Sequence, residues 1–174
     1  RLTARSIDLS NLQSDASKPT FFWRGKYLEN FNSRETLDVR LNAYEDYKPQ
    51  LDEAARGSKF VLLGNISPAI QSAILDLVRE PQFVILDTMD LWISTERDGL
   101  LNLVRRCDLL ILNDSEAKML AGTNNIIVAG RELQKLGVKN VIIKTGEYGA
   151  MLFSGDDFFV IPAYPVAALH DPTG

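Results

Sequence analysis

The sequence predicts an α/β protein built on a mostly parallel β-sheet with helices on both faces, and three features lead to this prediction. Short, continuous apolar runs recur between residues 60 and 144, as expected of strands buried on both faces. Between these runs, apolar residues recur at helical spacing. The two patterns alternate along the chain, which is typical of parallel sheets whose neighbouring strands are joined by crossover helices.

Individual elements follow from the same patterns. We expect strands at 60–64, 83–87, 109–113 and 141–144, then a hairpin formed by 151–153 and 158–161. Helices are expected at 68–78, 95–107 and 126–136, with a short helix after Ser115, which could cap it. The aromatic segment 20–27 predicts a further strand, whereas 30–58 is predicted as loop with short extended or helical pieces.

Composition and charge exclude several classes of protein. The chain has 174 residues, 45% of them hydrophobic and 24% charged, as in an ordinary globular domain. A net charge of −4 offers no basic field to nucleic acid or anionic lipid, and no apolar run has the length of a membrane span. Cys107 is the only cysteine, which excludes an internal disulfide. We therefore expect a cytoplasmic protein without nucleic-acid or membrane partners.

Asn113 and Glu116 follow the third predicted strand, where ligands of open α/β sheets bind. Their spacing lets an amide and a carboxylate project from the strand end and the first helical turn toward one crevice. The amide could orient a phosphate, and the carboxylate could hold a hydrated Mg²⁺. The alternative is that residues 114–116 only cap a helix and favour its dipole.

Lys144, Gly146 and Gly149 follow the fourth predicted strand. The two glycines would let backbone approach a ligand closely, and the lysine could neutralise phosphate charge. The alternative is a tight turn between two strands with a solvated lysine.

The chain ends in Asp171-Pro172-Thr173-Gly174, which reads as a turn about to open a helix. A Gly-rich turn before a helix binds anions, because free backbone N–H groups and the positive end of the helix dipole point the same way. This segment is therefore a candidate anion site.

Taken in order, Asn113-x-x-Glu116, Lys144-x-Gly146-x-x-Gly149 and Asp171-Pro172-Thr173-Gly174 resemble the motifs of the ribokinase-like sugar kinases, the PfkB carbohydrate kinase family. The family's closing signature is Asp-x-Thr-Gly-Ala-Gly-Asp, of which the chain holds the first four positions. The resemblance implies a partial ribokinase-like (Rossmann-like) domain over residues 1–174, with a small β lid at about 20–28 and an α/β core at about 59–174. A first βαβ unit would precede Arg1, and the catalytic segment would follow Gly174.

The resemblance implies an enzyme that uses ATP to phosphorylate a hydroxymethyl group of a sugar or nucleoside-like substrate. Asn113, Lys144, Gly146 and Gly149 would bind ATP and its phosphates, and Glu116 would hold Mg²⁺ through water. Thr173 and Gly174 would begin the anion hole that stabilises the transferring phosphoryl group. The catalytic Asp of the signature is not among the 174 residues, so we expect this chain to be inactive and the intact protein active.

The lid and one departure from the family pattern lead to further expectations. Aromatic residues in segment 20–28 would allow a homodimer to form through the lid. Asp87-Thr88-Met89-Asp90 stands where many relatives carry Asp-x-Asn followed by Arg, so we expect Asp87 to end its strand rather than to contact substrate or phosphate.

Two other functions stay open at this point. One is a non-catalytic module of the same fold that senses a sugar or nucleotide. The other is an unrelated doubly wound enzyme such as a nucleotide-dependent oxidoreductase, which is disfavoured because no G-x-G-x-x-G follows any predicted strand. The sequence does not predict which sugar or nucleoside would be the substrate.

Overall fold

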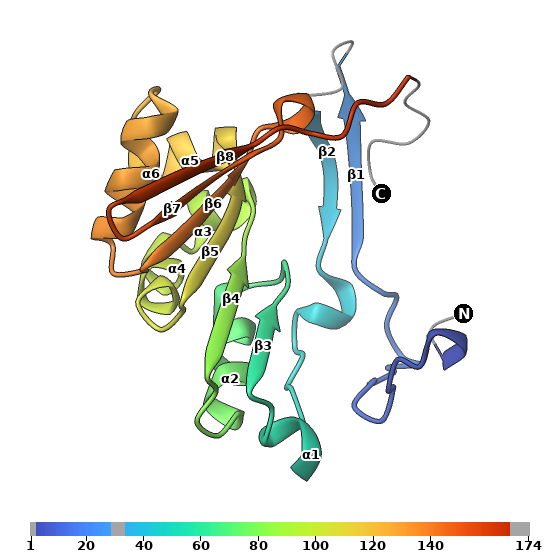
Figure 1. Ribbon diagram of the computed structural model, residues 1–174. Coiled ribbons are helices and arrows are strands. Elements are labelled where there is room, and N and C mark those ends of the chain that lie inside the picture. Colours follow the sequence, from blue (N-terminus) through green and yellow to red (C-terminus); the bar gives the residue numbers. More distant parts are fainter. Residues whose placement is uncertain (1–2, 29–33, 168–174) are drawn as a thin grey trace. The chain divides into compact units, whose positions relative to one another are not determined.

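The computed structural model describes residues 3–28 and 34–167 (Figure 1). The chain divides into two compact units, one formed by residues 1–52 with 165–174 and the other by residues 53–164. Residues 113–149, which carry two of the predicted site motifs, belong to the second unit.

The first unit contains a two-stranded antiparallel sheet of β1 (Phe22–Tyr27) and β2 (Arg34–Arg40), with short 3₁₀ turns at Thr3–Arg5 and Asn42–Tyr44. Strand β1 matches the predicted lid strand. β2 occupies a region predicted as loop with short extended pieces, because its alternating charged residues give no apolar run. The pairing is reinforced by side chains: Trp23 Nε1 donates to Thr36 Oγ1 at 3.2 Å, and the Arg40 guanidinium lies 5.7 Å from the centre of the Phe22 ring.

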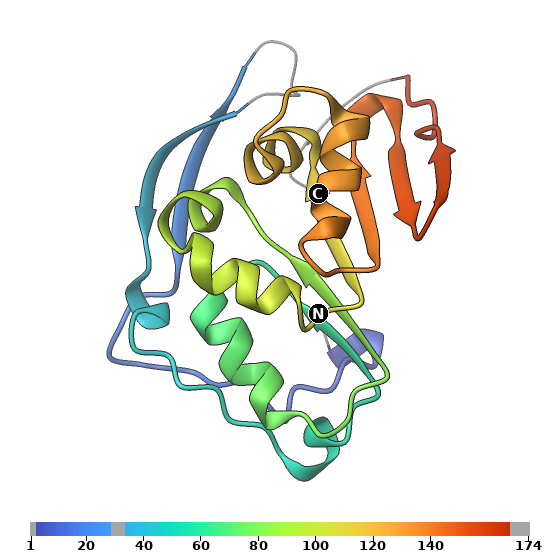
Figure 2. The same ribbon diagram turned by 90° about the vertical axis from the view of Figure 1, so that its left-hand side faces the viewer.

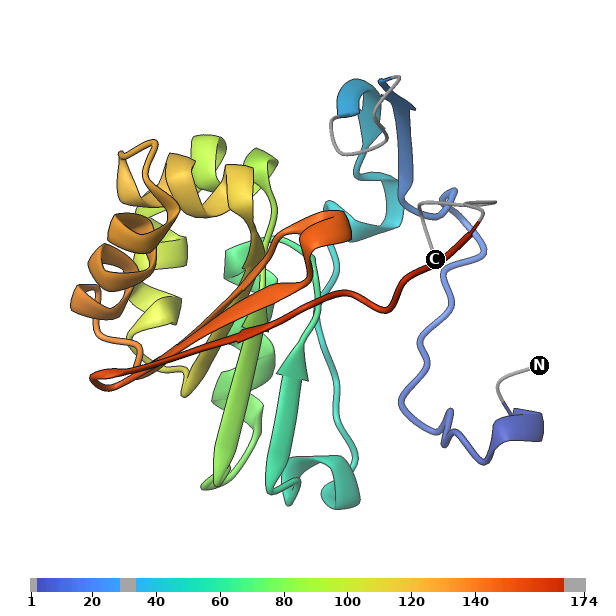
Figure 3. The same cartoon turned by 45° about the horizontal axis from the view of Figure 1, so that its top comes forward.

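The second unit is built on a six-stranded sheet in the order β3-β4-β5-β6-β7-β8. The strands are β3 (Phe60–Leu63), β4 (Phe83–Asp87), β5 (Leu109–Asn113), β6 (Asn140–Lys144), β7 (Ala150–Ser154) and β8 (Asp157–Ile161). Strands β3 to β6 pair in parallel, and β7 and β8 add an antiparallel hairpin that extends the sheet beside β6 (Figure 3). The predicted mostly parallel sheet and its closing hairpin are confirmed.

Six helices accompany these strands: α1 (Glu53–Arg56), α2 (Pro68–Leu77), α3 (Asp90–Thr95), α4 (Arg97–Val104), α5 (Asp114–Ala121) and α6 (Ile126–Lys135). A 3₁₀ turn, η3 (Gly146–Tyr148), follows β6. The helix predicted at 95–107 corresponds to α4, and α3 before it was not predicted. The backbone leaves the helical region at Glu96 (φ −130°, ψ 37°) between these two helices. The predicted cap of the short helix was wrong, because Asn113 and not Ser115 is its N-cap.

Helices α2 to α6 all lie on the same side of the sheet (Figures 1 and 2). The strand order explains this arrangement. Crossovers between parallel strands are right-handed, so a chain that adds each new strand on the same side of the last one places every crossover helix on one face. A second helical layer on the opposite face is absent from the residues that the structure describes.

Burial alternates along the strands accordingly. The side chains that point toward the helices are fully buried, among them Leu86, Leu110, Leu112, Val141, Ile143 and Phe153. The opposite face carries Leu62, Ile85, Ile111 and Ile142, which are half-buried or exposed. At the β3 edge, Phe60 is 75% and Leu62 67% exposed. None of the helices within the described ranges is both long and apolar enough to cross a membrane.

Close packing of α6 on β7 predicts an unusual response to a helix-favouring substitution. A Cβ atom at Gly130 would lie 2.3 Å from ring carbons of Phe153, which is fully buried and cannot yield freely. We expect Gly130→Ala to lower the free energy of unfolding by about 1–3 kcal/mol, because overpacking outweighs the helix propensity of alanine. Urea denaturation measures this change.

The matched control is Gly99→Ala in α4, where the nearest atom to a new Cβ is 3.7 Å away. There the same substitution should stabilise the chain by up to about 1 kcal/mol. Equal effects at the two positions would contradict the packing argument.

Candidate active site

Three polar side chains end neighbouring strands at one edge of the sheet. Asn113 and Lys144 are the last residues of β5 and β6 and are direct partners in the parallel register. Asp87 is the last residue of β4 and pairs with Ile111 of β5. Because the carboxyl ends of parallel strands meet at one edge, the sheet brings an amide, an ammonium group and a carboxylate together, where ligands bind in folds of this kind.

Asn113 and Glu116 form a capping box at the start of α5. Asn113 Oδ1 accepts hydrogen bonds from Glu116 N at 2.8 Å and Ser115 Oγ at 2.7 Å, and Glu116 Oε2 accepts from Asn113 N at 2.8 Å. Glu116 is only 4% exposed. The capping role that the sequence left open as an alternative is therefore present, and it fixes both side chains at the strand end.

Glu116 also has the donor chemistry that Mg²⁺ prefers. A carboxylate can hold this ion with the help of water and nucleotide phosphates, since Mg²⁺ rarely takes an all-protein cage. Within residues 3–28 and 34–167, no group of three or more His, Cys, Asp or Glu side chains is placed to hold a metal. Glu116 is thus a carboxylate that could hold a metal at this edge together with water and phosphate oxygens.

The turn after β6 is tight and depends on glycine. Thr145 N and Thr145 Oγ1 both donate to the Gly149 carbonyl, at 2.8 and 2.9 Å, and Gly149 N donates to the Gly146 carbonyl at 3.1 Å. Gly149 has φ 98°, and a Cβ there would lie 2.0 Å from the Ile161 carbonyl oxygen. Gly149 is thus required by the approach of the chain after β8, whatever its part in ligand binding.

Lys144 has an anionic neighbour, Asp87, that was not predicted from the sequence. Asp87 Oδ1 lies 3.9 Å from Lys144 Nζ, an ion-pair distance too long for a hydrogen bond. Burial raises the pKa of the Asp87 carboxyl, and the charge of Lys144 offsets only part of that shift. Asp87 ends its strand as expected, and it also shares the site with the lysine.

Unpartnered polar atoms gather around the end of β4. Among the described residues, the buried side-chain atoms without a hydrogen-bond partner are Gln71 Oε1, Asp87 Oδ1 and Thr88 Oγ1. Such atoms are uncommon in folded proteins and often mark functional positions. Gln71 was missed from the sequence, although its position four residues before Leu75 on α2 places a polar side chain on an apolar helix face.

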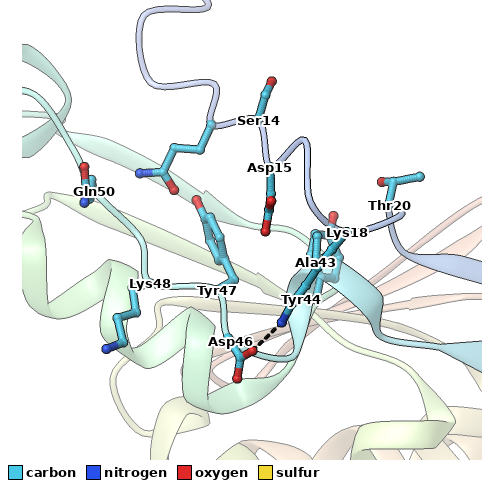
Figure 4. A pocket seen from close by; sticks show the side chains of 11 residues that line it. Ser14, Asp15, Lys18, Thr20, Ala43, Tyr44, Asp46, Tyr47, Lys48 and Gln50 are labelled. Carbon is cyan, nitrogen blue, oxygen red and sulfur yellow. Dashed lines mark hydrogen bonds and ion pairs between the residues drawn. The ribbon is translucent and has the colours of Figure 1, made fainter.

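The remaining predicted residues lie elsewhere. Thr173 and Gly174, with the rest of the closing motif, are outside the described residues. A separate hollow of about 470 Å³ occurs within the first unit, where Tyr44, Tyr47 and the ion pair of Lys18 with Asp46 line it (Figure 4). It contains none of the predicted site residues.

Asn113 caps α5 and is also a predicted phosphate-binding residue, and two substitutions test its capping role. Asn113→Ala removes the acceptor for Glu116 N and should lower the free energy of unfolding by about 1 kcal/mol, whereas Asn113→Asp keeps an acceptor and should change it by a few tenths. Urea denaturation of both variants checks this expectation. Equal losses in the two variants would show that the cap does not account for the stability at this position.

The raised pKa of the Asp87 carboxyl leads us to expect that the stability of the chain depends on pH. A raised pKa in the folded state means that the protonated carboxyl favours folding, and that this contribution is lost as the pH rises through the folded pKa. Asp87→Asn should therefore raise the melting temperature at pH 7, and the difference from the unsubstituted chain should shrink as the pH falls toward about 4. The control is Asp157→Asn at an exposed position. A gap at Asp87 that widens on acidification would contradict this prediction.

Known proteins share both the sequence pattern and the fold. Over 80 residues, the chain is 36% identical to a cytidine kinase of Thermococcus kodakarensis, covering 45% of this chain and 28% of that protein. Over 162 residues, it is 27% identical to a 1-phosphofructokinase of Borreliella burgdorferi, covering 86% of this chain and 52% of that protein. The chain thus spans about half, or less, of the length of these relatives.

The fold matches the crystal structure of a nucleoside kinase from Methanocaldococcus jannaschii, described as an archaeal member of the ribokinase family. The TM-score is 0.71 at 16% identity, covering 99% of this chain and 56% of that one. Residues 30–174 match the sequence profile of the pfkB family carbohydrate kinases. The chain therefore belongs to the pfkB family of carbohydrate kinases.

Proposed function

We propose that the whole protein uses ATP to phosphorylate a hydroxymethyl group of a sugar or nucleoside. The observation that carries this proposal is the register pairing of Asn113 with Lys144 at the carboxyl ends of β5 and β6. Phosphoryl transfer depends mainly on positioning and charge neutralisation, and these two side chains offer an amide and a cation at one place.

In this proposal, Lys144 neutralises phosphate charge while Asn113, together with the turn from Gly146 to Gly149, positions the phosphates. The half-exposed Lys144 ammonium supports its role, because it reaches solvent at the strand end. Glu116 would hold Mg²⁺, which would supply charge neutralisation at the phosphates. The capping box supports this role, since it keeps the carboxylate fixed beside Asn113.

Thr173 and Gly174 are proposed to begin the anion hole, on the resemblance of the closing motif alone. We also infer a cytoplasmic location, and a homodimer through the strands β1 and β2 is a further proposal. A net charge of −4 favours neither nucleic acid nor an anionic membrane as a partner.

The substrate class is tested by a panel of sugars, sugar phosphates and nucleosides offered to the whole protein with ATP and Mg²⁺. The panel includes cytidine, adenosine and fructose 1-phosphate, and ADP release is the readout. Turnover with one class supports the proposal and names the substrate. ATP binding without turnover of any acceptor would instead favour a non-catalytic sensing module.

Lys144→Met in the whole protein should lower kcat/KM for ATP by about 10- to 100-fold, because a hydrogen bond to a charged phosphate is lost. The control is Lys139→Met, which removes an exposed lysine just before the same strand, at its other end. That variant should keep the activity of the unsubstituted protein. A similar loss in both variants would argue against a specific role for Lys144.

A further inference from the structure

Gln71 is a buried amide in a position where an apolar side chain would be expected. It lies on α2, is 0% exposed, and shares the buried face of that helix with Leu75. Burying an amide costs free energy unless its polar atoms are bonded. The position therefore calls for an explanation in terms of what the amide holds.

The amide holds the ends of two strands. Gln71 Nε2 lies 2.8 Å from the Gly64 carbonyl oxygen, 2.9 Å from that of Asp87 and 3.3 Å from that of Leu63. The opposite orientation would set Gln71 Oε1 against three carbonyl oxygens, so the surroundings determine which end of the amide faces the strands. One side chain thus links the last residues of β3 and β4.

This link lies where the backbone ladder stops. The register of β3 with β4 ends at the pair Leu63 and Leu86, and Asp87 pairs only with β5 on its other side. Gln71 supplies the missing connection between Asp87 and the end of β3. The backbone of Asp87 is consequently held from both sides.

The Asp87 carboxylate is carried by that backbone, and the Thr88 backbone also hydrogen-bonds to it. Its Oδ1 atom has no hydrogen-bond partner among the described residues, and it stands 3.9 Å from Lys144 Nζ. A carboxylate and an ammonium that are free to approach form a charge-assisted hydrogen bond at about 2.8 Å. At 3.9 Å this pair stops short of that distance, and the backbone of Asp87 sets how far its short side chain can reach toward Lys144.

We propose that Gln71 is a positioning residue that keeps Asp87 away from a direct hydrogen bond with Lys144, so that the ammonium stays available to a nucleotide phosphate. The inference rests on the proposed phosphate-binding role of Lys144. Without the clamp, Asp87 would move onto Lys144 and compete with phosphate for it. The reaction's chemistry would be unchanged, and binding of ATP would weaken.

The test compares Gln71→Met, which has a similar shape and no donor, with Gln71→Asn, which keeps a shorter amide. In crystal structures of the chain, the separation of Asp87 Oδ1 and Lys144 Nζ should shorten to about 2.8 Å in Gln71→Met. In the whole protein, KM for ATP should rise about fivefold, as expected for one partly exposed ionic contact, with a smaller change in kcat. For Gln71→Asn, the KM for ATP should lie between that of the unsubstituted protein and that of Gln71→Met. This variant also serves as the folded one if Gln71→Met does not fold.

The decisive comparison measures the effect of Gln71→Met in a protein that already carries Asp87→Asn. If Gln71 acts through the charge of Asp87, Gln71→Met should not raise KM further once Asp87 is asparagine, although it should still lower the melting temperature. Gln134→Met is the matched control, because Gln134 Nε2 links the Lys139 and Gly155 carbonyls at 3.0 and 3.1 Å away from the site. This variant should lose stability and keep the KM for ATP.

The inference is overturned if the separation stays near its present value in Gln71→Met, or if the rise in KM persists in the Asp87→Asn background. A protein that binds and turns over no nucleotide would end the proposed function instead. The crystallographic separation would still decide whether Gln71 restrains Asp87.

Discussion

The site depends on one constraint: strands β3 to β6 pair in parallel, and their order in the sheet is the same as their order in the sequence. Right-handed crossovers then send helices α2 to α6 to one face, and the carboxyl ends of β3 to β6 lie at one edge. Residues far apart in sequence, such as Asp87 and Lys144, meet only because of this topology. The polar groups need no long loops to reach one another, and small helical caps and turns are enough to fix them.

Sequence reasoning predicted those parts of the fold whose cause is local. Apolar runs located β3 to β6, and the helical spacing of apolar residues located α2 and α6. The strand β2 was less visible because its charged residues alternate on a two-stranded sheet that has no buried face to impose a pattern. The short helix α3 before Glu96 was not predicted either, because the polar stretch 94–99 separates its three apolar residues from the apolar periodicity of α4.

The sequence indicated the residues of the candidate site better than it indicated the contacts between them. Asn113, Glu116 and Lys144 lie at or just after the ends of predicted strands. In open parallel sheets, residues at the carboxyl ends of strands are candidates for ligand binding. The contacts of Gln71 and the pairing of Asp87 with Lys144 were not accessible, since both join residues that the sequence separates by at least seven positions. Glu116 shows that two explanations are compatible: the box that caps α5 also immobilises a carboxylate, so the capping role does not conflict with the proposed metal-binding role.

The place of strand β3 at the end of the six-stranded sheet, among the residues that the structure describes, has a practical consequence for any study of assembly. It ends the sheet, and Phe60 and Leu62 are largely exposed on it. Open strand edges with apolar side chains are templates for pairing with another polypeptide. A dimer or aggregate of this chain in solution would therefore need to be traced to this strand or to the strands β1 and β2 before it is interpreted.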